Sequence, residues 1–295
     1  MPDVSRSCWG AEALRQQLQP LWPGLSVEIL PVVDSTNSRL LRSAADRQPR
    51  LLVAEQQTHG RGRQGREWHA SAGASLTFSL ALPMAPLSWS GLSLAVGLAL
   101  AEALDPAAVP EAGWRPRIGL KWPNDLWLWE GPGRGRKMAG ILIETVSAGE
   151  GRMCVVGVGL NIAPQPASGP SAGAACLQEI DASATAARAL ATVVGPLALA
   201  LRRFERHGFS ALAPAYARRD LLQGQQVRTQ SAGANPPGLA ALHGLAEGVD
   251  AQGALCVRVA TGLHRLVSGE VSVRFCDEAP PGWPDAAGRQ GDPPC

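Results

Sequence analysis

The chain has 295 residues, of which 45% are hydrophobic and 18% charged, and this balance predicts a folded globular protein of one or two domains. Its formal net charge of +2 is too small to indicate a nucleic-acid partner from charge alone. Residues 1–19 carry charges and lack the apolar core of a signal peptide, and the longest apolar stretch, residues 92–104, is too short to span a membrane.

Cysteine and histidine usage gives no sign of a metal site. The histidines show no ligand pattern, so we expect no protein-built metal site. The cysteines are far apart and lack ligand spacing, which predicts reduced thiols in a cytoplasmic protein. The six are Cys8, Cys154, Cys176, Cys256, Cys276 and Cys295.

Residues 1–222 predict a domain in which strands and helices are mixed. Asp34 or Ser35 is a natural N-cap for the second helix. Residues 163–175, rich in Pro, Gly, Ser and Ala, are expected to form a long mobile loop. Helices are expected at 10–19, after 34–37, and at 88–104, 182–206 and 211–219. Strands are expected at 27–33, 51–54, 75–82, 118–122, 126–129, 141–146 and 154–160.

The pattern changes near Leu222. Short strands separated by Gly and Asp predict a small all-β domain over residues 223–277, and residues 278–295 have the composition of a disordered tail. The strands are expected at 226–229, 239–247, 254–259, 263–268 and 271–274. We find no repeat, no coiled coil and no helix-turn-helix.

The chain has only two lysines among its 27 basic residues, Lys121 and Lys137. Arginine replaces lysine in most surface roles, but not where a compact ammonium must approach one oxygen end-on. The two lysines lie in one short block, which favours a specific role over chance.

Four segments carry candidate chemistry, and each has an ordinary structural alternative. The first, Gly60-Arg61-Gly62-Arg63-Gln64-Gly65-Arg66, offers backbone amides and cations to a polyphosphate, a carboxylate or both; the alternative is a solvated basic turn or an RNA-binding patch. Gln57 before it and Trp68 after it favour a ligand site. It matches neither a P-loop nor a dinucleotide fingerprint.

The other three segments are Lys121-Trp122-Pro123-Asn124-Asp125, Arg136-Lys137-Met138-Ala139-Gly140-Ile141-Leu142-Ile143-Glu144 and Val156-Gly157-Val158-Gly159-Leu160-Asn161. Asn124 and Asp125 at a strand end can hold Mg²⁺ or orient an amine, or can simply form an Asx turn. Lys137 at a strand mouth can bridge two anions, or can be an ordinary edge lysine. The alternating glycines leave room for a flat ligand or for tight strand packing.

Taken together, these segments resemble the bacterial biotin protein ligases in order and spacing, over nearly the whole chain from Asp34-Ser35-Thr36-Asn37 onward. The resemblance implies an α+β fold, with a mixed β-sheet flanked by helices, related to class II aminoacyl-tRNA synthetases, and then a small SH3-like β-barrel. It implies that ATP activates biotin to biotinyl-5′-AMP with Mg²⁺. Biotin then passes to a lysine of the biotin carboxyl carrier protein of acetyl-CoA carboxylase.

The resemblance also assigns roles by position. Lys137, Arg63 and Asp125 are the expected catalytic residues, with Asp125 orienting the incoming lysine near Mg²⁺. Residues expected at biotin are Ser35, Thr36, Asn37, Gln57, Arg61, Gly62, Arg63 and Lys137. Residues expected at ATP are Arg63, Arg66, Trp68, Lys121, Asn124 and Asn161.

Two departures from the family pattern modify this expectation. Residues 130–136 predict a longer, Gly-rich hairpin loop than the shortest members have, which leaves Arg134 and Arg136 unplaced. The winged DNA-binding domain of bifunctional members is missing, so we expect a ligase that is not itself a repressor. The family contains monomers and sheet-extended dimers, and a homodimer stays open here.

Two alternatives remain open from sequence. A lipoate or octanoate ligase of the same fold would not need the polar cluster of Ser35, Thr36, Asn37 and Gln57, which suits a ureido ring. A nucleic-acid-binding module built on residues 60–66 would need a broad basic stripe, which the net charge of +2 argues against. No membrane partner is expected.

Overall fold

The computed structural model describes residues 9–106, 116–165, 173–231, 242–267 and 271–276. The expected tail at 278–295 and the middle of the expected loop at 163–175 lie outside these ranges. None of the helices in these ranges combines the length and apolar character needed to cross a membrane.

The larger part of the molecule is a seven-stranded mixed sheet, as expected. Its strand order is β1-β2-β3-β7-β6-β5-β4, with β1 and β2 parallel and every other pair antiparallel. The strands are β1 (Ser26–Val33), β2 (Arg50–Gln57), β3 (Ser75–Pro83), β4 (Ile118–Lys121), β5 (Asp125–Gly131), β6 (Arg134–Ala148) and β7 (Gly151–Asn161). The parallel pair requires a crossover, which α3 (Thr36–Arg42) supplies.

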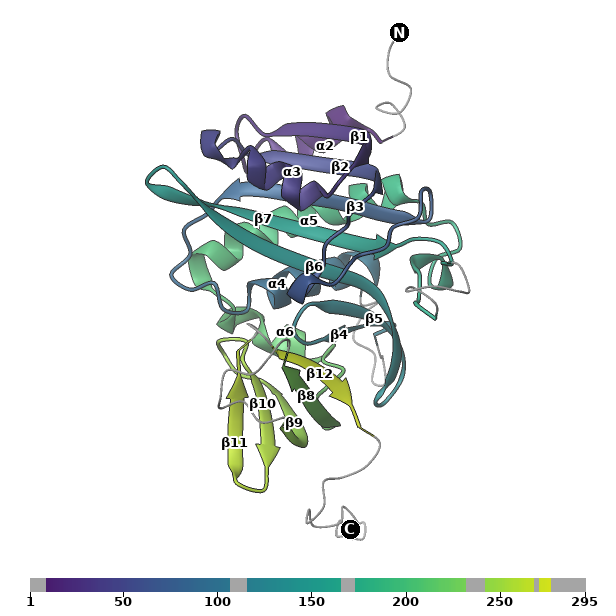
Figure 1. Ribbon diagram of the computed structural model, residues 1–295, viewed down its shortest axis with the longest axis vertical. Helices are drawn as coiled ribbons and strands as arrows, with labels where there is room; N and C mark the ends of the chain where they lie inside the picture. The colour runs from purple at the N-terminus through teal and green to yellow at the C-terminus, as the bar shows by residue number, and fades with distance from the viewer. Residues whose placement is uncertain (1–8, 107–115, 166–172, 232–241, 268–270, 277–295) are drawn as a thin grey trace.

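Helices cover both faces of this sheet. Side chains alternate along each strand, so apolar residues point to both faces and each face packs against helices. On one face, Leu52 of β2 joins Leu40 of α3 in a small apolar cluster. On the other, Leu51 and Val53 join the main core beneath α2 (Ala11–Leu18), α4 (Leu92–Leu104) and α5 (Ala186–His207). Figure 1 shows α3 in front of the strands, with α4 and α5 behind them.

The expected helices are present, although one is shorter than expected. Ser35 is the N-cap of α3, and its Oγ accepts a hydrogen bond from the Ser38 amide at 3.4 Å. Asp34, the other candidate, instead binds Arg42, which lowers the pKa of its carboxyl to about 2. Residues 211–219 divide into a 3₁₀ turn and α6 (Ala213–Ala217).

The expected loop between β5 and β6 was wrong. Gly131 pairs with Arg134, so the two strands continue to a tight turn at Pro132 and Gly133. Gly131 and Gly133 have φ values of 140° and 67°, which glycine adopts without strain, so the turn is short. The Gly-rich composition therefore marks a turn between two extended strands.

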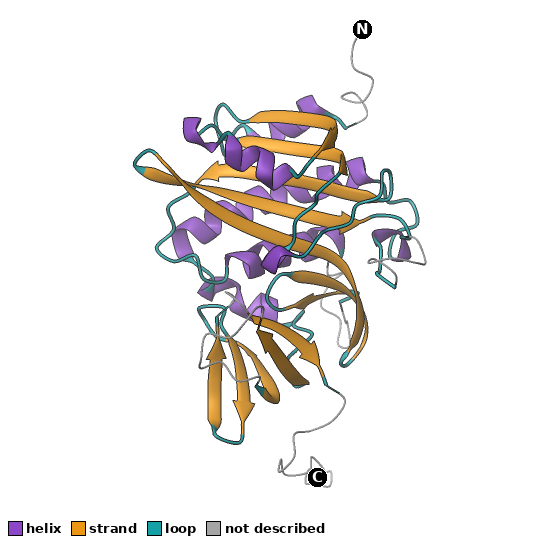
Figure 2. Cartoon of the chain, in the orientation of Figure 1, coloured by secondary structure: helices purple, strands orange, loops and turns teal. Residues whose placement is uncertain are grey.

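A smaller antiparallel sheet follows, in keeping with the expected SH3-like barrel. Its order is β11-β10-β9-β8-β12. The strands are β8 (Gln226–Ser231), β9 (His243–Val249), β10 (Leu255–Val259), β11 (Gly262–Leu266) and β12 (Val271–Phe275). The smaller sheet lies against the β4–β5 end of the large sheet, beside α6 (Figures 1 and 2). Buried residues of both sheets belong to one continuous core.

Candidate active site

One cavity of about 730 Å³ contains residues of all four sequence segments. The fourteen residues expected at biotin, at ATP or in catalysis all line it, although their roles remain predictions. They are Ser35, Thr36, Asn37, Gln57, Arg61, Gly62, Arg63, Arg66, Trp68, Lys121, Asn124, Asp125, Lys137 and Asn161. The cavity therefore joins a polar end at the start of α3 to a cationic end beside the smaller sheet.

The polar end is a hydrogen-bonded cluster built on α3, β2 and β3. The side-chain carbonyl of Gln57 accepts from the Thr36 amide at 2.8 Å and lies 3.1 Å from the Thr36 hydroxyl. The buried Ser79 hydroxyl lies 2.7 Å from the Thr36 hydroxyl and 2.6 Å from Asn37 Oδ1. These bonds fix the polar groups before any ligand enters, and preorganised polar groups suit a small ligand with fixed donors and acceptors.

Asn37 is bound to the protein through both ends of its amide. Its Nδ2 donates to the Leu142 carbonyl at 3.2 Å and to Glu144 Oε2 at 2.9 Å. A Cβ at Gly157 would collide with the same amide, so one of the alternating glycines makes room for Asn37. Asn37 thus ties α3 to β6 and β7, as well as lining the cavity.

The loop of residues 60–66 crosses the cavity and is held by side-chain contacts to other segments and by a hydrogen bond within the loop. The Arg61 guanidinium donates to Glu144 Oε1 at 2.9 Å, and the Gly62 amide donates to the Arg66 carbonyl at 2.7 Å. Arg63 donates to Asn124 Oδ1 at 3.3 Å. Burial lowers the pKa of Arg63, an effect that the nearby Asp125 carboxylate opposes. The Gly62 amide and the Arg61 and Arg63 side chains are therefore already hydrogen-bonded within the protein. The loop thus offers fewer exposed amides to a ligand than the sequence predicted.

Trp68 occupies the flat space beside Gly159, the other alternating glycine, and beside Gly140 of β6. A Cβ at Gly159 would collide with its indole, and one at Gly140 would lie 3.3 Å from its Cζ3. The sequence left a flat ligand or close packing open; the described structure places the chain's own indole there. The indole Nε1 is buried and has no hydrogen-bond partner among the described residues.

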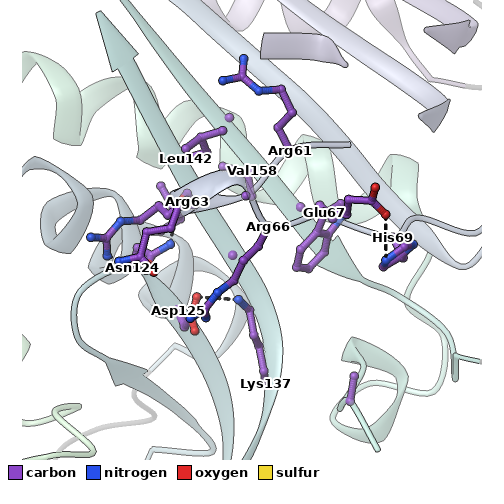
Figure 3. Close-up of a pocket in the computed structure, with 18 of the residues that line it drawn as sticks. Arg61, Arg63, Arg66, Glu67, His69, Asn124, Asp125, Lys137, Leu142 and Val158 are labelled. Carbon is purple, nitrogen blue, oxygen red and sulfur yellow. Dashed lines mark hydrogen bonds and ion pairs between the residues drawn. The ribbon is translucent and has the colours of Figure 1, made fainter. Parts of the chain in front are cut away.

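Lys137 lies within β6 and pairs with Trp127 of β5, so the expected position at a strand mouth was wrong. Its Nζ is 2.8 Å from Asp125 Oδ1 and 5.7 Å from the centre of a Trp68 ring. Figure 3 shows the Arg66 and Lys137 side chains approaching Asp125 from the loop and from β6, whereas Arg61 points away from them.

Asn161 and Lys121 line the cavity but are hydrogen-bonded to backbone carbonyls, whereas Arg136 lies outside it. Asn161 Nδ2 donates to the Ala175 carbonyl at 3.1 Å, and its buried Oδ1 has no partner among the described residues. Lys121 is 6% exposed and donates to the Val273 carbonyl of the smaller sheet. Arg136 is an ion-pair partner of Glu130 and Glu179, away from the cavity lining.

Sequence reasoning missed Arg274 and Glu144. Arg274 of β12 lines the cavity, although an arginine in a short strand gives no signal of this placement. Glu144 closes the third segment, but its double contact with Asn37 and Arg61 depends on three elements meeting.

The charge of the cavity suits anionic ligands. Two carboxylates, Glu67 and Asp125, face six cations within the described lining. The cations are Arg61, Arg63, Arg66, Lys121, Lys137 and Arg274. In the part of the chain that the structure describes, no three His, Cys, Asp or Glu side chains gather as metal ligands.

Comparison with known proteins finds similar proteins over most of the chain. Residues 29–161 match the Biotin/lipoate A/B protein ligase family, and residues 240–274 match the Biotin protein ligase C terminal domain. The chain is 34% identical to the biotin–[acetyl-CoA-carboxylase] ligase of Mycobacterium tuberculosis, over 88% of this chain and 93% of that one. It is 32% identical to the bifunctional ligase/repressor BirA of Escherichia coli, over 86% and 76% respectively.

A solved structure is also similar to this chain. The biotin protein ligase of Aquifex aeolicus, in complex with biotin and ATP, matches with a TM-score of 0.68 and 28% identity. The match covers 85% of this chain and 99% of that one.

Proposed function

The chain belongs to the biotin protein ligase family, and on this premise we propose that it activates biotin with ATP and then transfers it to a carrier protein. The first step would form biotinyl-5′-adenylate and pyrophosphate. The second would form an amide with one lysine of the biotin carboxyl carrier protein of acetyl-CoA carboxylase. The observation that carries this proposal is a single cavity that joins a fixed polar cluster to six cations.

The polar end is the proposed site of the biotin ureido ring. Ser35, Thr36 and Gln57 present hydroxyl and amide groups whose positions are already fixed, and Asn37 of α3 ties this cluster to β6. A saturated alkyl chain would leave the remaining hydrogen-bonding capacity of these groups unused and shielded from water, which lowers affinity. This cluster therefore favours biotin over lipoate or octanoate.

The cationic end is the proposed site of acid activation. A carboxylate attacking the α-phosphate of ATP brings two anions together, and fixed cations between them stabilise the transition state. Lys137, Arg61, Gly62 and Arg63 would lie between the biotin carboxylate and the α-phosphate, with Arg66 and Arg274 toward the other phosphates. Mg²⁺ would be held mainly by ATP phosphates and would neutralise part of their charge; Asp125, a carboxylate of the cavity lining beside Lys137, fits such a partial ligand.

The transfer step needs a neutral amine beside a carboxylate that can accept its proton. Asp125 is the proposed base, and its Oδ1 lies 2.8 Å from Lys137 Nζ in the absence of substrate. Trp68 and Asn161 are the proposed neighbours of the nucleotide. The buried Trp68 Nε1 and Asn161 Oδ1, one donor and one acceptor, support this assignment because both lack protein partners among the described residues.

The proposal includes a cytoplasmic location, where carrier and ATP are found together. Sedimentation would show whether the protein forms a homodimer, and the edge strand β1 is the surface to examine.

Acid-dependent ATP–pyrophosphate exchange tests the first step, on wild type, Lys137→Ala and Lys137→Arg. Exchange with biotin, largely lost in both variants, is the expected result, because arginine keeps the charge but not the compact shape. Exchange with lipoate or octanoate in place of biotin would move the chain to the sister activity. No exchange with any acid would refute the proposal, and binding of oligonucleotides would then be measured as the remaining alternative.

A further inference from the structure

The Lys121 ammonium is enclosed between the two sheets of the molecule. Lys121 is the last residue of β4, and its Nζ donates 2.6 Å to the Val273 carbonyl of β12. The same Nζ lies 5.1 Å from the centre of the Trp127 ring and 5.9 Å from that of Phe275. The contact joins residues 152 positions apart in sequence.

This environment explains why lysine occurs here in a chain that otherwise uses arginine. The two rings pack edge to face, with centres 5.9 Å apart, and the ammonium meets one carbonyl oxygen end-on. A planar guanidinium presents a wider fork and would not meet that single oxygen in the same enclosed space. Burying a cation is costly unless it is paired, so the carbonyl and the rings are needed to hold it.

The strand that receives this bond also carries a cavity residue. Val273 is followed by Arg274, which lines the cavity. Among the described strands β12 pairs only with β8, so its outer edge is open to a donor from the large sheet.

Two other hydrogen bonds between the larger part of the molecule and the smaller domain reach a different part of the smaller sheet. Trp122 Nε1 donates to the Gly253 carbonyl at 3.1 Å, and the Ser90 hydroxyl donates to the Gln252 carbonyl at 2.6 Å. Both acceptors lie in the turn between β9 and β10. Of these three bonds, the one from Lys121 is the one that fixes the strand bearing Arg274.

We propose that Lys121 is a positioning residue that fastens β12 to the large sheet and so holds Arg274 at the cationic end of the cavity. Through the Lys121 side chain, the binding of the polyphosphate substrate comes to depend on the smaller domain. The choice of ATP as the affected substrate rests on the proposed function; the fastening of β12 does not.

The test compares Lys121→Met, which keeps the length and the packing between the rings, with Arg274→Met and with Ser90→Ala. Ser90→Ala is the matched control, since it removes one contact between the domains that lies outside the cavity. Lys121→Met is expected to raise the KM for ATP in pyrophosphate exchange by about tenfold or more, as for loss of a charged hydrogen bond. The KM for biotin should stay within about twofold, and Ser90→Ala should change neither by more than that.

Two further readouts separate positioning from general damage. Lys121→Met combined with Arg274→Met should be no worse than Arg274→Met alone, because both changes remove the same contribution. Lys121→Gln, which keeps a shorter donor, should give an intermediate KM for ATP and serves if the Met variant does not fold. Effects of Lys121→Met and Arg274→Met that multiply, or an unchanged KM for ATP, would overturn the proposal.

The pH dependence supplies an independent signature. Burial lowers the pKa of Lys121 to about 8; Asp125 of β5 opposes this, whereas Arg274 of β12, Lys137 of β6 and Arg66 of the loop reinforce it. The kcat/KM for ATP should therefore fall as the pH rises through about 8 in wild type, and this fall should be absent in Lys121→Met. The same fall in both proteins would count against the proposal.

Hydrogen exchange of residues 271–275, measured without any ligand, tests the fastening by itself. Faster exchange in Lys121→Met than in wild type or Ser90→Ala supports it, and equal exchange refutes it. If wild type lacked pyrophosphate exchange while this difference persisted, the proposed function would fail and the fastening of β12 would stand.

Discussion

Replacing Asp220 by asparagine should stabilise the protein in a pH-dependent way. Asp220 is 5% exposed, and burial raises the pKa of its carboxyl to about 6, although hydrogen bonds from the Leu222 and Gln223 amides partly oppose this. Its Oδ1 accepts from the Leu222 amide at 2.9 Å, and asparagine keeps that acceptor. Its Oδ2 is buried without a hydrogen-bond partner among the described residues.

The sign follows from proton binding. The pKa in the folded state, about 6, lies above the ordinary value of 3.8, so the folded protein binds more protons between these values. Stability is therefore lost as the pH rises from about 4 to about 6, and the full penalty persists at higher pH. At about 1.4 kcal/mol per pKa unit, the total is about 3 kcal/mol, of which about 2 kcal/mol develops between pH 4.5 and 8.

Urea unfolding of wild type and Asp220→Asn at pH 4.5 and pH 8 measures this difference. The free energy of unfolding of the variant, relative to wild type, should rise by about 2 kcal/mol between the two pH values. Asp34→Asn is the control without pH dependence in this range, because Arg42 lowers the pKa of Asp34 from 3.8 to about 2. Its contribution to stability therefore changes below about pH 4.5 and stays nearly constant between the two assay pH values. Equal pH dependence of wild type and Asp220→Asn would refute the reasoning.

Three further predictions concern the cavity. Asp125→Asn should keep pyrophosphate exchange within several-fold but slow single-turnover transfer from preformed biotinyl-adenylate by about a hundredfold or more, and equal losses in both steps would argue against a role as base. Gly159→Ala should displace the Trp68 indole and weaken ATP use in the exchange assay, whereas Trp68→Ala with Gly159→Ala should be no worse than Trp68→Ala alone; additive losses would contradict this explanation. With only Lys121, Lys137 and the N-terminal amine available, incubation with biotin and MgATP without carrier should give very weak self-labelling by intact mass, and several added biotins would rule this out.

Much of the cavity could be predicted because its residues are adjacent in sequence to strand ends or glycines. The start of α3, the loop after β2 and the β4–β5 turn each bring several polar residues to one place, so a local pattern was enough. The polar cluster and Lys121 were located in this way.

What could not be predicted depends on contacts between distant segments. The two glycines at 131 and 133 look like a loop, and only the pairing of Gly131 with Arg134 shows that the strands continue through them. Lys137 was wrongly placed at a strand mouth because the sequence does not show that β6 already pairs with β5 at that residue. Arg274 reaches the cavity because β12 lies beside β4, and nothing in its own strand indicates that neighbour.

The ion pair between Lys137 and Asp125 has a consequence for the timing of the proposed reaction. While the two groups remain 2.8 Å apart, each occupies the other, so neither is free to act on a substrate. A substrate carboxylate that draws Lys137 toward itself leaves Asp125 without its nearest cation, and a freed carboxylate is the group that an incoming amine needs. One bond can thus set the sequence of two chemical steps, since the catalyst for the second is released by the substrate of the first.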